Sequence, residues 1–81
     1  MSKIAFIGAG STIFAKNVLG DCLMVPALDG FEFALYDIDP RRLKESKDML
    51  EHLRNRYNET ISIRAYDDRK EALAGAKYII N

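Results

Sequence analysis

The chain of 81 residues has one cysteine, one histidine, two prolines and no tryptophan, and its charges sum to zero. A single cysteine cannot form an internal disulfide, which favours a reducing, cytoplasmic location. Because 12 basic side chains balance 12 acidic ones, nothing in the charge favours a nucleic acid or membrane partner. No apolar run approaches the roughly 20 residues that span a bilayer. Met1–Lys3 leads directly into a short apolar run, which is not the pattern of a secretory signal.

What the sequence does have is an alternation of short apolar runs with amphipathic segments. The apolar, β-branched and aromatic runs predict strands at Lys3–Gly8, Phe31–Tyr36, Thr60–Tyr66 and Ala76–Ile80. Apolar residues at helical spacing and capping signals predict helices at Ser11–Met24, Pro40–Tyr57 and Arg69–Ala74. This β-α-β-α-β-α-β order predicts an α/β fold with a Rossmann-type parallel sheet, right-handed crossovers and strand order 3-2-1-4.

Several single residues sharpen these boundaries. Asp39-Pro40 is a typical helix start, and Gly75 is placed to end the last helix. Gly20 falls inside a helix, where close packing against a strand would explain it.

The fourth strand has no partner on its outer edge, whereas parallel sheets are normally covered. We therefore expect residues 1–81 to be the front part of a larger dinucleotide-binding domain, with the catalytic remainder outside this chain.

Chemistry is expected first at the glycine-rich turn between the first strand and the first helix. Gly8 permits a tight turn, and Gly10, which has no Cβ, lets a pyrophosphate approach the backbone. The amides of Ser11, Thr12 and Ile13 would then face the phosphates. Ile13 stands where the general dinucleotide fingerprint has a third glycine. The alternative is a strand-to-helix turn that binds nothing.

A carboxylate at the end of the second strand is the second element of such a site. Asp37 would bind the adenosine ribose hydroxyls, and the alternative is that it only caps the next turn. A carboxylate there repels a 2′-phosphate, which favours NAD over NADP, although Arg41 and Arg42 follow closely. Arg42 is also a candidate for the adenine edge. Asn81, at the carboxyl end of the fourth strand, is a candidate contact on the nicotinamide side.

The remaining polar residues give no site. His52 lies on a charged helix and reads as a solvated side chain, and Cys22 as a buried structural thiol. Asp67 and Asp68 are too few for a hard-metal site, so capping is the simpler interpretation. We expect no catalytic residue and no metal ligand within this chain.

Specific blocks of the sequence resemble the family 4 glycoside hydrolases, within which they are most similar to the α-galactosidase (melibiase) branch. These blocks are Ile4–Phe14, Lys16-Asn17, Leu19–Asp21, Tyr36–Leu43, Lys70–Leu73 and Ala76–Ile80. Ile13 in place of a third glycine also matches this family. The resemblance implies that Gly8, Gly10, Ser11 and Thr12 face the pyrophosphate and that Asp37 binds the ribose.

The resemblance also implies an unusual hydrolysis of a glycoside. NAD⁺ oxidises the sugar at C3, a base removes the C2 proton, the glycosidic bond is eliminated, water adds and hydride returns. A divalent metal such as Mn²⁺ assists, with ligands downstream of this chain, and we expect the parent protein to be a homo-oligomer. The alternatives are a 2-hydroxy-acid dehydrogenase-like oxidoreductase that uses NAD, and a stand-alone nucleotide-binding module.

Overall fold

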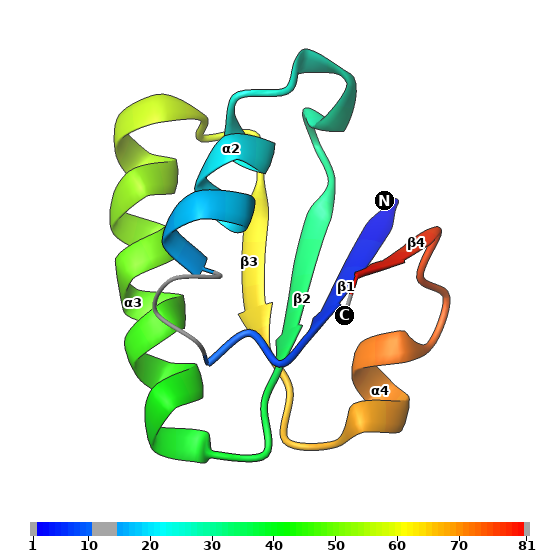
Figure 1. Ribbon diagram of the computed structural model, residues 1–81. Helices are drawn as coiled ribbons and strands as arrows, with labels where there is room; N and C mark the ends of the chain where they lie inside the picture. Colours follow the sequence, from blue (N-terminus) through cyan, green and yellow to red (C-terminus); the bar gives the residue numbers. More distant parts are fainter. Residues whose placement is uncertain (1, 11–14, 81) are drawn as a thin grey trace.

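The computed structural model describes residues 2–10 and 15–80, which include a four-stranded sheet (Figure 1). The strands are β1 (Lys3–Ile7), β2 (Glu32–Tyr36), β3 (Ser62–Ala65) and β4 (Tyr78–Ile80). All pairings are parallel and the spatial order is β3-β2-β1-β4. The predicted α/β class, Rossmann-type sheet and strand order are therefore confirmed.

The core lies on one face of the sheet, where alternate residues of the central strands point. Ile4 pairs with Phe33 and Phe6 with Leu35 in the β1–β2 register, so their side chains share this face. The Phe6 and Phe33 rings pack in a tilted arrangement with centroids 5.2 Å apart. Helical residues close the cluster from outside the sheet: Leu19, Leu23, Leu43 and Leu50.

Helix α3 (Pro40–Tyr57) has the bounds that the sequence predicts. Its start is fixed by Asp39, whose carboxylate accepts the Arg41 and Arg42 amides at 3.0 and 3.3 Å. Leu43 and Leu50 are buried, and Met49 and Leu53 pack against the same cluster. Among the described helices, none is long and apolar enough to cross a membrane.

The first crossover differs from the prediction. The structure has a π-helix at Ala15–Leu19, then a short α-helix, α2 (Gly20–Leu23), and a 3-10 helix at Pro26–Leu28. A continuous α-helix over Ser11–Met24 is therefore wrong for Ala15–Leu19. The wider π turn has a different angular spacing of side chains from an α-helix. Within it, Leu19 is buried and its neighbour Val18 is 37% exposed. The expected close packing at Gly20 is also wrong, since a Cβ there meets nothing within 4 Å among the described residues.

The last crossover, helix α4 (Arg69–Leu73), covers the opposite face of the sheet (Figure 1). Ala72 of this helix is fully buried, as are Ala5 of β1 and Ala34 of β2. Asp68 caps the helix by accepting the Lys70 amide at 3.0 Å, and Gly75 follows with φ +72°, both as predicted. Small side chains at this contact let a short helix lie close to the sheet.

Candidate functional site

The candidate site is the edge of the sheet where β1 and β2 both reach their carboxyl ends. The amides of Gly8 and Ala9 donate to the Tyr36 carbonyl at 2.9 and 3.0 Å, which joins the turn after β1 to the end of β2. Gly8 has φ +83°, so the predicted tight turn is present and uses a conformation that favours glycine. In open α/β sheets, ligands bind beyond this edge.

Asp37 lies directly beyond β2, and both of its carboxylate oxygens accept main-chain hydrogen bonds. The Gly10 amide donates to Oδ2 at 2.9 Å, and the Asp39 amide donates to Oδ1 at 2.8 Å. Asp37 therefore caps the following turn, the alternative that the sequence left open. An ionised carboxylate has about four acceptor positions, so two remain for ligand hydroxyls. Capping and ligand binding are thus compatible at this residue.

Gly10 is required here for a reason that the sequence does not reveal. A Cβ at residue 10 would lie 2.7 Å from Asp37 Cγ, 2.8 Å from Oδ2 and 2.9 Å from Arg42 Cβ. Any side chain would force these groups apart. The prediction that Gly10 makes room for a pyrophosphate stays a prediction, while its role in admitting the Asp37 carboxylate is visible in the structure.

The arginines that follow are directed toward nearby carboxylates. Arg42 Nε lies 3.8 Å from Asp39 Oδ2, and Arg41 Nε lies 3.8 Å from Glu45 Oε1. The Cβ atom of Arg42 lies next to Gly10. The contact of Arg42 with the adenine edge stays a prediction. The other predicted contacts, Ser11, Thr12, Ile13 and Asn81, lie outside the described residues.

Ile38 is a feature of this edge that the sequence reasoning missed. It lies between Asp37 and Asp39 and is 90% exposed, the highest value among the exposed large hydrophobic residues of the described chain. The hydrogen bond from the Asp39 amide to Asp37 spans it, so this apolar side chain is presented outward on a fixed turn. An apolar residue between two aspartates just after a strand was the available signal.

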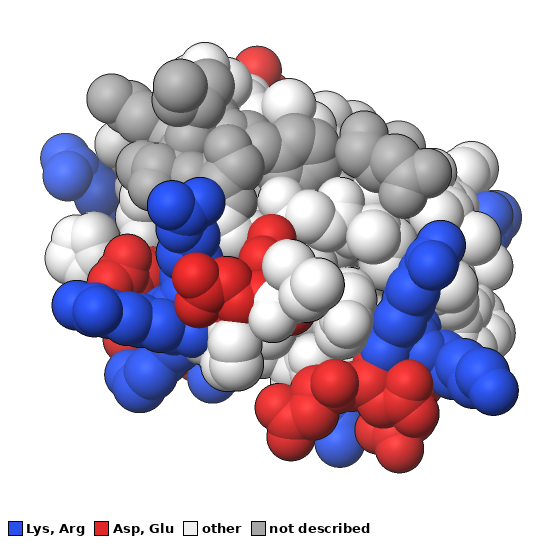
Figure 2. Space-filling view, turned by 60° about the horizontal axis from the view of Figure 1, so that its bottom comes forward, with Lys and Arg blue, Asp and Glu red and all other residues white. Residues whose placement is uncertain are grey.

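Charges of both signs are mixed on this side of the molecule. Figure 2 shows acidic and basic side chains interspersed rather than a field of one sign. The part of this face drawn in colour therefore shows no field of one sign that would attract a charged ligand over long range. Local main-chain and side-chain donors would have to provide the affinity for an anionic group.

The structure also places two other polar residues that the sequence analysis considered. His52 is exposed on α3, as predicted, whereas Cys22, predicted to be buried, is only half-buried, with burial and the Asp21 carboxylate raising the pKa of its thiol. Within residues 2–10 and 15–80, no three His, Cys, Asp or Glu side chains are grouped in a way that could hold a metal ion.

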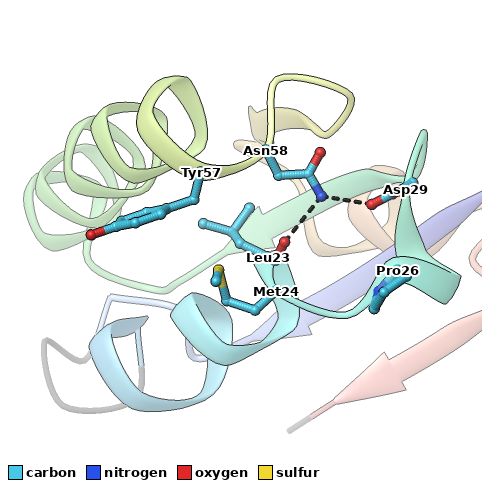
Figure 3. A pocket seen from close by; sticks show the side chains of 6 residues that line it. All are labelled: Leu23, Met24, Pro26, Asp29, Tyr57 and Asn58. Carbon is cyan, nitrogen blue, oxygen red and sulfur yellow. Dashed lines mark hydrogen bonds between the residues drawn. The ribbon is translucent and has the colours of Figure 1, made fainter.

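A separate pocket of about 230 Å³ lies near the amino ends of β2 and β3 (Figure 3). Its polar side is organised by Asn58, whose Nδ2 donates to the Leu23 carbonyl at 3.0 Å and to Asp29 Oδ1 at 2.7 Å. The exposed side chains of Met24 and Tyr57 supply apolar walls. This pocket is at the opposite end of the sheet from Gly10 and Asp37.

Comparison with known proteins identifies the family of this chain. The model of the family 4 glycosyl hydrolases matches residues 3–81. The chain belongs to the family 4 glycosyl hydrolases. The predicted resemblance is therefore confirmed.

Relatives of this chain are named as glycosidases that act on different sugars. The chain is 72% identical over 81 residues to an α-galactosidase of Bacillus subtilis, covering all of this chain and 19% of that protein. It is 42% identical to an α-galactosidase of Rhizobium meliloti, covering 98% of this chain and 16% of that protein. It is 34% identical to an α-glucosidase of Erwinia rhapontici, covering 98% and 17%. The chain thus spans about a fifth or less of the length of these relatives.

Proposed function

We propose that this chain binds NAD along the carboxyl edge of its sheet, as part of a glycosidase that hydrolyses α-galactosides. The observation that carries the cofactor assignment is the Asp37 carboxylate, held against the Gly10 amide at the junction of β1 and β2. A carboxylate beside a glycine turn matches what the two ribose hydroxyls and the adjoining pyrophosphate of a dinucleotide require.

The residues present fit NAD better than NADP. Asp37 keeps acceptor positions for the hydroxyl groups of the ribose, and its negative charge would repel a 2′-phosphate. Arg41 and Arg42, which would have to offset that repulsion, lie near Glu45 and Asp39 instead. Ile38 offers an apolar surface next to the ribose position, where it can pack against the face of a base. When bound, NAD⁺ supplies a reversible hydride acceptor.

The sugar substrate is proposed from similarity alone. The 72% identical relative and the 42% identical relative are both named α-galactosidases, whereas the 34% identical one is named an α-glucosidase. Galactoside hydrolysis is therefore the activity that we assign. The requirement for Mn²⁺ and a homo-oligomeric state belong to the same proposal, and we assign the metal no ligand among the described residues.

A substrate and cofactor test separates this proposal from its alternatives. The protein as encoded by its gene would be freed of nucleotide and metal, then assayed on 4-nitrophenyl α-galactoside. We expect hydrolysis only when NAD⁺ and Mn²⁺ are both returned, with no net formation of NADH. Net NADH formation from a 2-hydroxy acid without metal would instead indicate a dehydrogenase. NAD binding without either activity would indicate a nucleotide-binding module.

A further inference from the structure

Three consecutive amides after β1 are held by the end of β2. Gly8 and Ala9 donate to the Tyr36 carbonyl, and Gly10 donates to the Asp37 carboxylate rather than to another carbonyl. The first two contacts are main chain to main chain and do not depend on side-chain identity. The third depends on the side chain at residue 37, so Asp37 extends the ladder of main-chain contacts by one residue.

This third contact holds Gly10, the last described residue before the segment that is expected to face the phosphates. The Gly10 amide immediately precedes Ser11, the first of the residues whose amides are expected to face the pyrophosphate. The contact is partly buried, and its donor–acceptor distance of 2.9 Å is that of a well-formed hydrogen bond. The absence of a side chain at residue 10 is what allows the carboxylate to come this close.

We propose that Asp37 positions the glycine turn for the pyrophosphate, in addition to binding the ribose. The inference rests on the proposed function, because it concerns the same dinucleotide. It assigns to one carboxylate two separable effects: a direct one on the ribose hydroxyls, and an indirect one on phosphate binding through the Gly10 amide. The second effect persists for a ligand that has no ribose hydroxyls to offer.

The test compares NAD⁺ with an analogue lacking both hydroxyls of the adenosine ribose. Asp37→Asn retains the size of the side chain but replaces one carboxylate oxygen with an NH2 donor, so the Gly10 and Asp39 amides no longer each face an acceptor oxygen. We expect this variant to weaken binding of the analogue at least about fivefold, measured by calorimetry. Hydrogen exchange at the Gly10 amide, followed by NMR without ligand, should become faster.

Two further variants serve as control and as confirmation. Asp68→Asn removes an equal charge from the same sheet edge, where Asp68 caps α4, and should change affinity for the analogue by less than about twofold. Asp37→Ala removes both acceptor oxygens and adds no bulk at residue 10, so it should weaken binding of both ligands. It also keeps the question answerable if Asp37→Asn does not fold.

The outcomes distinguish the two proposals. If the unchanged protein binds both dinucleotides and Asp37→Asn loses affinity only for NAD⁺, Asp37 acts on the ribose alone and the positioning role is wrong. If the unchanged protein binds neither dinucleotide, the proposed function fails and this inference fails with it.

Discussion

At residue 10, the addition of one methyl group should have a large effect. Gly10→Ala would place a Cβ 2.7 Å from Asp37 Cγ and 2.9 Å from Arg42 Cβ, inside normal contact distance. We expect the substitution to lower the free energy of unfolding by about 1–3 kcal/mol, because the crowded groups must move apart. Urea denaturation measures this loss, and an unchanged midpoint would show that the carboxylate is not held as the structure describes.

Tyr66 gives a second prediction at the residue scale. Its hydroxyl donates to Glu32 on the neighbouring strand, and its ring lies 4.5 Å from Lys3 Nζ. Burial first, then the hydrogen bond and charge of Glu32, raise the pKa of Tyr66 above its usual value of about 10. A raised folded-state pKa means that this contribution to stability is complete below pH about 10 and is lost as pH rises further.

Tyr66→Phe should therefore lower stability near neutral pH by about 1 kcal/mol and reduce the loss of stability above pH 10. Denaturant titrations at pH 7 and at several values above pH 10 would measure both effects. Tyr57→Phe, at a tyrosine that is 52% exposed, is the matched control. An equally steep alkaline loss in Tyr66→Phe would contradict the assignment.

At the scale of elements, the first crossover contains a residue that weakens its own helix. Gly20 begins α2 without a positive φ, and a Cβ there would meet nothing within 4 Å among the described residues. Gly20→Ala should therefore raise the free energy of unfolding by about 0.5–1 kcal/mol. A change from glycine to alanine is thus expected to lower the free energy of unfolding at residue 10 and to raise it at residue 20. Destabilisation measured by thermal unfolding would mean that Gly20 faces a contact outside the described part.

The sequence predicts best those elements whose signals are local. Helix α3 is predicted to the residue because Asp39 and Pro40 mark its start, and Asp68 and Gly75 frame α4 in the same way. The π-helix at Ala15–Leu19 was missed because apolar spacing does not distinguish it from an α-helix over a few residues. The contact that explains Gly10 joins residues 27 positions apart, so no local pattern reveals it.

In the candidate site, too, the residues with local sequence signals were predicted and those that depend on the folded structure were not. Gly8 and Asp37 were predicted from their places at the ends of two strands, and the structure brings them to one edge. Ile38 was missed because its 90% exposure depends on how the turn to α3 is held.

For the whole molecule, the edge of the sheet at β4 is where we expect chains to associate in solution. Tyr78 and Ile79 are 50% and 56% exposed, and β4 pairs with β1 on one side only among the described strands. Exposed apolar edge strands promote association between chains. We expect the 81-residue chain to be marginally stable and to associate as its concentration rises. Sedimentation velocity over a concentration series measures this.

Ile79→Lys tests whether β4 is the associating edge. A lysine on an edge strand opposes pairing with another chain, so this variant should remain monomeric at concentrations where the unchanged chain associates. Met24→Lys is the matched control, since Met24 is 62% exposed but lies at the pocket beyond α2. Equal effects of the two lysines, or a monomer with a sharp, concentration-independent thermal transition, would contradict the role of β4.

The most direct test of the account is a crystal structure of the protein, as encoded by its gene, grown with NAD⁺. The account predicts that the adenosine ribose hydroxyls lie within hydrogen-bond distance of the Asp37 carboxylate and that the pyrophosphate lies beside Gly10. A dinucleotide bound elsewhere, for example in the pocket lined by Met24 and Tyr57 at the other end of the sheet, would contradict it.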